Sequence, residues 1–176
     1  MSPASTPSAG PARILGIDAS LRSTGLAIVE AEGSRMKAVW HGRVRNPPAR
    51  PLSACLLAVE EAAAEQIAAH RPRAAAIEGV FFSKNMRTTL ILGHVRGVLI
   101  AQCARAGVPV YEYEPRRVKQ AVAGVGSAVK EQMQRMVATL LGLGTLPQED
   151  EADALALAIC HLHNRTRMRL GGLEPL

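Results

Sequence analysis

The sequence predicts an α/β protein in which helices flank a mixed five-stranded central sheet. Short apolar runs of strand length alternate with longer segments whose apolar residues recur at helical spacing, which is typical of a layered α/β fold. At 176 residues, the chain is long enough for one domain with a full core and too short for two large ones. Because 48% of the residues are apolar but only 3% are aromatic, we expect a core of Ala, Val, Leu and Ile.

Five segments are expected to form the strands. The first three follow one another through short connections, and Gly25 should relax the backbone where the second strand begins. The fourth is short and continuously apolar, which is typical of a buried strand in a parallel position. The expected strands cover residues 14–19, 25–31, 36–44, 74–78 and 108–112.

The segments between and after these strands are expected to be helical. Pro72 follows the first helix as a stop, Gly107 should end the second at its C-cap, and Ser127 should cap the fourth at its N-terminus. The expected helices cover residues 52–70, 86–106, a short segment opened by Pro115, 127–141 and 150–164.

The ends of the chain and its cysteines bear on where the protein works. Residues 1–12 are rich in Ser, Pro, Ala and Gly, which predicts a disordered tail rather than a signal peptide. We expect one folded domain over residues 13–165, followed by a flexible basic tail over residues 166–176. The three cysteines lack metal-type spacing and are odd in number, so we expect buried thiols in a reducing cytosol. No apolar run is long enough to cross a membrane, so we expect a cytoplasmic protein with no membrane partner.

The charge of the chain is strongly basic. A formal charge of +6 and a pI near 9.8 favour a polyanionic partner, of which nucleic acid is the commonest. Charge retained for solubility explains the same excess equally well, so both interpretations stay open at this point.

Four acidic residues stand at the edges of the expected core. Asp18 and Glu78 each end an apolar strand, whereas Asp150 and Asp153 share one face at the start of the last helix. Acidic residues at a helix N-terminus also offset the helix dipole, and this ordinary explanation stays open for the pair. However, a desolvated carboxylate is costly unless a positive charge meets it. Acids from three separate segments therefore favour a shared divalent-cation site.

Seven stretches of the chain, in order and with little change in spacing, resemble the RuvC family of bacterial Holliday-junction resolvases between residues 14 and 163. The matching stretches are Leu15-Gly16-Ile17-Asp18 with Ser23-Thr24-Gly25, Ile77-Glu78-Gly79-Val80-Phe81 with Lys84-Asn85, Arg96-Gly97-Val98, Tyr111-Glu112-Tyr113, Val118-Lys119-Gln120, Gly124-Val125-Gly126-Ser127-Ala128-Val129-Lys130 and Asp150-Glu151-Ala152-Asp153-Ala154-Leu155-Ala156. The resemblance implies a ribonuclease H-like fold and a homodimer. One departure is Ala19-Ser20, where the family usually has Pro-Gly after its first aspartate; it alters the turn but keeps the carboxylate.

The resemblance also implies roles for particular residues. It assigns catalysis and metal binding to four acids, catalysis and DNA binding to two lysines, and DNA binding to two residues after the second acidic strand. These are Asp18, Glu78, Asp150 and Asp153, then Lys119 and Lys130, and finally Phe81 and Lys84. Without the resemblance, either lysine reads as an ordinary surface residue. Phe81 could stack on an unpaired base, but core packing explains an aromatic there equally well.

The resemblance implies an endonuclease that resolves four-way DNA junctions in recombination and repair. Paired nicks in strands of like polarity would leave 5′-phosphate and 3′-hydroxyl ends. Carboxylates suit Mg²⁺, with Mn²⁺ as a substitute, and two such ions about 4 Å apart can activate water and stabilise the leaving oxygen. The partners that the resemblance implies are the junction, a second copy of the chain and a branch-migration helicase complex. Gly93 and Gly97, four residues apart in an apolar helix, would let a partner helix approach.

Three other functions fit parts of the pattern. A ribonuclease H-like nuclease acting on RNA or an RNA–DNA hybrid would use the same kind of carboxylate site for divalent cations. A non-catalytic junction-binding protein would have the same basic surface. A phosphotransferase of the actin–sugar kinase class begins with a similar strand, but those enzymes need two such domains.

His161 could approach the acidic site, although a solvated helix end is the simpler expectation.

Overall fold

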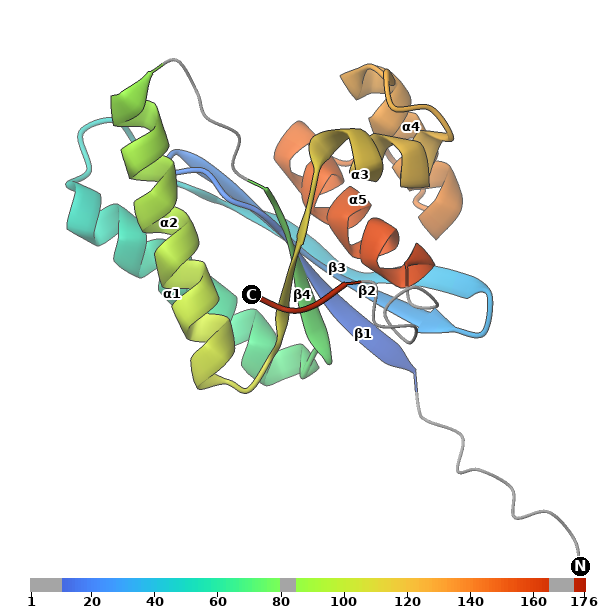
Figure 1. Ribbon diagram of the computed structural model, residues 1–176, viewed down its shortest axis with the longest axis horizontal. Helices are drawn as coiled ribbons and strands as arrows, with labels where there is room; N and C mark the ends of the chain where they lie inside the picture. Colours follow the sequence, from blue (N-terminus) through green and yellow to red (C-terminus); the bar gives the residue numbers. More distant parts are fainter. Residues whose placement is uncertain (1–10, 80–84, 165–172) are drawn as a thin grey trace, which may run out of the picture.

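One mixed sheet of five strands forms the centre of the computed structural model, which describes residues 11–79, 85–164 and 173–176. The strands are β1 (Ala12–Asp18), β2 (Ser23–Glu32), β3 (Arg35–Arg45), β4 (Ala74–Glu78) and β5 (Val110–Tyr113). Their spatial order is β3-β2-β1-β4-β5 (Figure 1). The first three pair antiparallel, whereas β1 with β4 and β4 with β5 pair parallel. The predicted mixed five-stranded sheet is therefore confirmed.

Helices cover both faces of the sheet (Figure 1). Helices α1 (Leu52–His70) and α2 (Met86–Arg105) lie on one face, and α3 (Pro115–Ala123), α4 (Lys130–Leu141) and α5 (Glu149–His163) lie on the other. Of these, α5 packs most closely on the sheet, across β1 and β2. Among the described residues, no helix is both long and apolar enough to span a membrane.

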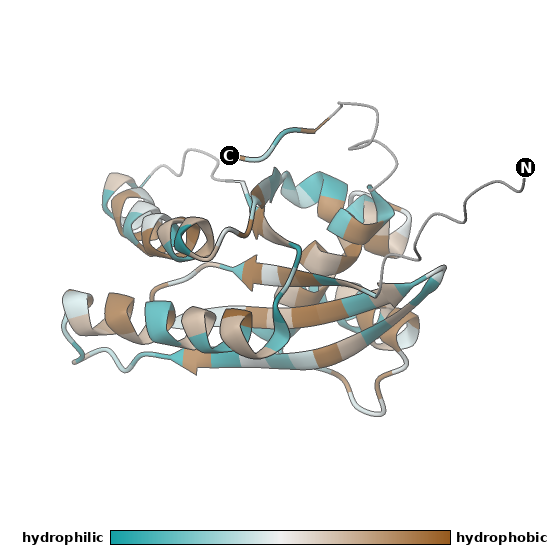
Figure 2. Ribbon diagram, turned by 90° about the horizontal axis from the view of Figure 1, so that it is seen from below, coloured by the Kyte–Doolittle hydropathy of each residue, from teal (hydrophilic) through white to brown (hydrophobic). Residues whose placement is uncertain are grey.

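The core has one half on each face of the sheet. Side chains alternate along β1, so Leu15 and Ile17 pack with α1 and α2, whereas Ile14 packs with the helices of the opposite face. In Figure 2, brown apolar segments recur along the strands and on the helices that flank them, interspersed with teal polar ones. Because Asp18 lies four residues after Ile14, the same alternation turns its side chain toward the α3–α5 face.

The expected elements are all present, although most of them begin or end a few residues away from the expected positions. Strand β5 begins at Val110 rather than at residue 108. The prediction that Ser127 caps the fourth helix is wrong, because α4 begins at Lys130 and the preceding residue, Val129, is extended. Ala128 is buried in the core, and this anchors the segment in a non-helical path before the helix starts. The three cysteines, Cys55, Cys103 and Cys160, are buried and free, as expected.

The end of the chain returns to the sheet. Leu173 packs against the core on the α3–α5 face, and the backbone N–H of Leu176 donates to the carbonyl oxygen of Val110 at 2.9 Å. Residues 1–10 and 165–172, which hold most of the two expected tails, lie outside the described residues.

Candidate active site

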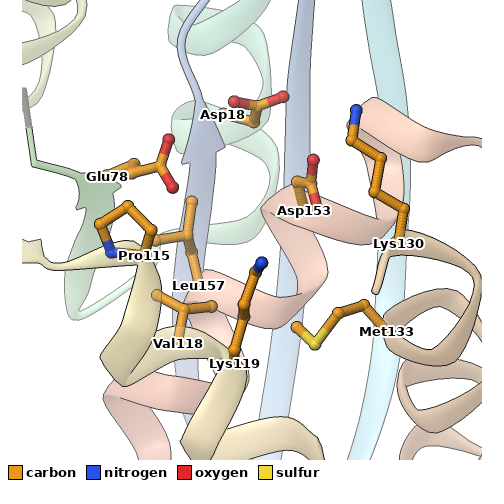
Figure 3. Close-up of a pocket in the computed structure, with 9 residues that line it drawn as sticks. All are labelled: Asp18, Glu78, Pro115, Val118, Lys119, Lys130, Met133, Asp153 and Leu157. Atoms are coloured by element: carbon orange, nitrogen blue, oxygen red, sulfur yellow. The ribbon is translucent and has the colours of Figure 1, made fainter. Parts of the chain in front are cut away.

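Two of the predicted site residues end neighbouring parallel strands. Ile17 of β1 is paired with Ile77 of β4, so Asp18 and Glu78 follow a matched pair at the carboxyl edge of the sheet. Ala76, two residues before Glu78, packs in the core on the α3–α5 face, which turns Glu78 toward the same side as Asp18. Figure 3 shows the two carboxylates at the tips of these strands.

The other two acids come from the N-terminal turns of α5, which lies directly on the sheet. A Cβ built on Gly16 would overlap the carbonyl oxygen of Ala154, and one built on Gly25 would overlap that of Asp150. Only glycine permits this approach of helix to strand, since any side chain would push α5 away. The sequence suggested that Gly25 relaxes the backbone, but its φ is not positive. Its role is instead to let the helix approach the strand.

A cavity of about 360 Å³ opens at this edge of the sheet. Three of the four acids and both predicted lysines line it, together with apolar side chains that form the wall toward α3 and α4 (Figure 3). The lining residues are Asp18, Glu78, Pro115, Val118, Lys119, Lys130, Met133, Asp153 and Leu157. The structure thus brings together residues from β1, β4, α3, α4 and α5.

Burial and mutual repulsion disfavour the charged forms of the cavity carboxyls. Burial, followed by the charges of Asp153, Glu78 and Asp150, raises the pKa of Asp18 to about 8. Burial and then Asp153 raise the pKa of Glu78, and burial and Asp150 raise that of Asp153. Lys130 opposes the shifts at Asp18 and Asp153. The site therefore holds more negative charge than its own lysines neutralise.

Asp150 lies beside this cluster but is turned toward the edge of the sheet. The hydroxyl of Ser23 donates to its carboxylate, and Arg43 Nη1 lies 3.8 Å from the same Oδ2 atom. Asp150 is not among the residues that line the cavity, although its charge reaches both Asp18 and Asp153. The predicted group of four is thus three carboxylates around one cavity and a fourth at its rim.

The two lysines approach the carboxylates from different helices. Lys119 lies in the middle of α3, and Figure 3 shows its side chain reaching up between Glu78 and Asp153. Lys130 begins α4, forms an ion pair with Glu149 of α5 and is largely exposed. Both positions are compatible with contact to a phosphate that enters the cavity.

Three other predicted residues lie elsewhere. Phe81 and Lys84 fall outside the described residues. The expectation of a solvated His161 is wrong, because this residue is 2% exposed and its Nδ1 lies 3.0 Å from the hydroxyl of Tyr113. His161 lies farther along α5 than Asp153 and therefore faces β5, where its ring also packs against Tyr111.

The donor set fits a divalent cation. None of the carboxylates of Asp18, Glu78 and Asp153 is ion-paired with another described residue, and hard cations such as Mg²⁺ bind carboxylate oxygen. Within residues 11–79, 85–164 and 173–176, no three Asp, Glu, His or Cys side chains already converge closely enough to hold one ion. The repulsion that raises their pKa values also opposes closer approach until positive charge enters.

Sequence reasoning missed several residues that shape the site. Gly16 and Ser23 stand in stretches noted only for the resemblance, and the partners that explain them lie more than a hundred residues away. Arg96 offered a clearer signal, because it stands between Val95 and Leu99 on the apolar face of a helix. A lone arginine on such a face predicts a buried ion pair.

Comparison with known proteins covers nearly the whole chain. The family model for crossover junction endodeoxyribonuclease RuvC matches residues 14–161, a span that contains all four acids. A protein of that name from Halorhodospira halophila is 48% identical over 154 residues, which make up 88% of this chain and 92% of that protein. One from Pelotomaculum thermopropionicum is 47% identical and covers 87% of this chain and 94% of its own length.

A solved structure shows the same arrangement. T. thermophilus RuvC in complex with Holliday junction substrate superimposes on this chain with a TM-score of 0.85 at 32% identity. The match covers 94% of this chain and 99% of that one. The ribonuclease H-like architecture expected from the sequence is therefore confirmed.

Proposed function

Because the chain belongs to the RuvC family of crossover junction endodeoxyribonucleases, we propose that it cuts four-way DNA junctions at the cavity lined by Asp18, Glu78 and Asp153. The family is one of metal-dependent nucleases that resolve Holliday junctions, and this chain is such a nuclease. The observation that supports this site most strongly is the set of carboxylates at one sheet edge that have raised pKa values and no ion-pair partner among the described residues.

The metal is proposed to be Mg²⁺, with two ions per site and Mn²⁺ as a substitute. Asp18, Glu78, Asp150 and Asp153 would hold them, since an all-carboxylate donor set suits hard cations. When bound, such ions supply Lewis-acid chemistry, lowering the pKa of the attacking water and neutralising charge on the phosphate and the leaving oxygen. The expected products are 5′-phosphate and 3′-hydroxyl ends.

The chain's own side chains would position the scissile phosphate. Lys119 and Lys130 enter from α3 and α4 and would bind its non-bridging oxygens as point charges. Lys130 must first exchange its surface ion pair with Glu149 for the phosphate, a small cost because exposed pairs contribute little. The apolar wall formed by Met133 and Leu157 would limit water on the side away from the DNA.

Two further residues are proposed to bind the junction. Phe81 would stack on a base that is unpaired at the crossover, and Lys84 would contact a phosphate. Both follow Glu78 within six residues of the sequence, and this short separation is the ground for proposing that they contact DNA bound at the cavity.

A homodimer is proposed for two reasons, the symmetry of the DNA junction and the exposed face of α2. A four-way junction has approximate two-fold symmetry, so two equivalent sites would nick two strands of like polarity. On α2, Met86 and Leu90 are exposed, and a Cβ added to Gly93 or Gly97 would meet no atom of the described residues within 4 Å. This open, partly apolar face suits a second copy of the helix. A branch-migration helicase complex and a cytoplasmic location complete the proposal.

A cleavage assay separates this function from its alternatives. With Mg²⁺, wild-type protein should cut a mobile four-way junction into ligatable duplexes and leave a linear duplex and an RNA–DNA hybrid intact. Asp18→Asn should still bind the junction but lose at least about 100-fold in cleavage, because a neutral amide binds the cation weakly. Glu61→Gln, on the exposed face of α1, is the matched control and should cut normally.

Two results would count against the proposal. Preferential cleavage of the hybrid would assign the chain to RNA metabolism instead. Tight junction binding without cleavage by wild type in either Mg²⁺ or Mn²⁺ would make it a junction-binding protein without nuclease activity.

A further inference from the structure

Arg96 is a charged residue buried in the face that α2 turns toward the sheet. It is 7% exposed and lies beside Val95 and Leu99, both fully buried. A guanidinium removed from water is costly unless its donors are paired, so its partners show what the burial achieves. They lie at the end of the strand that delivers Glu78.

The guanidinium joins the ends of two strands. Its Nη1 donates to the carbonyl oxygen of Glu78 in β4, and its Nη2 donates to the carboxylate of Glu112 in β5. These strands are neighbours, and Ile77 is paired with Glu112. A single planar side chain with fixed donor directions thus spans the two strands at the place where β4 ends.

Further contacts at the same peptide unit reinforce this clamp. The N–H of Gly79 donates to the carbonyl oxygen of Tyr113 at 2.9 Å, and a Cβ built on Gly79 would lie 3.3 Å from Glu112 Oε1. Glu112 therefore packs against the backbone immediately after Glu78. The peptide unit that joins Glu78 to Gly79 is therefore fixed at both of its polar groups, its carbonyl oxygen by Arg96 and its N–H by Tyr113.

Arg96 also reaches toward the acidic cluster. It lines a small cavity of about 30 Å³ together with Asp18, Glu78 and Leu92. Its positive charge partly offsets the rise in the pKa of Glu78 that burial and Asp153 cause. The same side chain therefore holds the backbone of Glu78, a proposed metal ligand, and partly neutralises the negative charge around it.

We propose that Arg96, held in place by Glu112, is a positioning residue that fixes the end of β4 so that the Glu78 carboxylate meets the divalent cation. This rests on the proposed function, because it assumes that Glu78 is a metal ligand. Residues that orient metal ligands typically change metal affinity by about 10–100-fold when they are replaced. Arg96 should therefore act on cation affinity more than on junction binding.

The test compares three variants of the full-length protein with wild type and a control. Arg96→Gln removes the charge, Arg96→Lys keeps the charge but cannot span both acceptors, and Glu112→Gln weakens the anchor at a half-exposed site. Arg105→Met is the matched control, since Arg105 lies on the same helix and its ion pair with Glu60 is at the surface, 2.6 Å long. Mn²⁺ affinity is measured without DNA by electron paramagnetic resonance, and cleavage is measured across a Mg²⁺ titration.

We expect Arg96→Gln and Arg96→Lys to weaken Mn²⁺ binding by at least about tenfold and Glu112→Gln by a few-fold. The Mg²⁺ concentration for half-maximal cleavage should rise in parallel, and saturating Mg²⁺ should restore most of the maximal rate. Junction binding in EDTA should stay within twofold of wild type, as should every property of Arg105→Met.

Three outcomes would overturn the inference. They are Mn²⁺ affinities unchanged in the Arg96 and Glu112 variants, a lower melting temperature as the sole effect, or an Arg96→Lys variant that binds Mn²⁺ as wild type does. The last would mean that charge alone matters. Failure of the proposed function is distinct, because wild type would then bind Mn²⁺ without cutting junctions.

Discussion

Replacing Asp18 by Asn should stabilise the metal-free protein at alkaline pH while abolishing cleavage. The folded state raises the pKa of this carboxyl from 3.8 to about 8, chiefly through burial and then through its acidic neighbours. Below about pH 4 the group is protonated in both the folded and the unfolded protein, so it costs nothing. The cost grows as the pH rises toward 8 and stays constant above that value, since the folded protein must then hold the charge.

The size of the effect follows from the shift. Each tenfold change in acidity is worth about 1.4 kcal/mol, so the full shift would cost the folded state about 6 kcal/mol above pH 8. The cavity is open to solvent, and water that enters it screens the charges, which reduces the expected cost to on the order of 2 kcal/mol. For a domain of this size that corresponds to about 4–8 °C in Tm.

Thermal unfolding in EDTA from pH 4 to pH 9 measures this directly. The Tm of Asp18→Asn should match wild type near pH 4 and exceed it increasingly up to pH 8, whereas the control Glu61→Gln should follow wild type throughout. Excess Mg²⁺ at pH 8 should raise the Tm of wild type more than that of Asp18→Asn. Parallel curves of Tm against pH for wild type and Asp18→Asn over the whole range would refute the reasoning. The charge on Asp18 would then not destabilise the folded protein.

Further predictions concern the parts of the site that other elements supply. Gly25→Ala should displace α5 from β2, lower cleavage by at least tenfold and reduce the Tm. In the control Gly144→Ala, the added Cβ meets no described atom within 4 Å, so cleavage and Tm should both stay unchanged. Equal behaviour of the two variants would contradict the close-approach explanation. Lys119→Met should reduce cleavage by about 100-fold and lower the slope of junction affinity against salt by about one, as for one lost phosphate contact, so an unchanged slope would remove Lys119 from the DNA. Ser23→Ala should strengthen Mn²⁺ binding by a few-fold, because it frees Asp150 from the hydroxyl donor that holds its carboxylate at the rim of the cavity, and identical isotherms would show that this bond is incidental.

Local pattern was sufficient to predict much of the fold. Strand-length apolar runs placed β1 and β4, and an acid at the end of each run placed Asp18 and Glu78 at one edge of the sheet. These features depend on near neighbours in sequence, because alternation and strand ends are set within a few residues. The resemblance then supplied the lysines, which composition alone could not separate from ordinary surface residues.

Features that depend on distant partners could not be predicted in this way. The need for glycine at position 25 exists only because the carbonyl oxygen of Asp150 lies against it, and the burial of His161 is compatible with its polar ring because Nδ1 is hydrogen-bonded to the hydroxyl of Tyr113. The start of α4 is set by the buried Ala128 rather than by the capping preference of Ser127. In each case a contact across the fold overrides the local preference.

Anomalous scattering from crystals soaked in Mn²⁺ would locate the cations directly. The structure predicts Mn²⁺ in the cavity between Asp18, Glu78 and Asp153, with the Asp150 carboxylate drawn from Ser23 toward the ions. Soaked crystals of Asp18→Asn should show weaker Mn²⁺ density at the same place. Mn²⁺ density elsewhere on the protein, with the cavity carboxylates left unbound, would contradict the assignment of this edge of the sheet as the nuclease site.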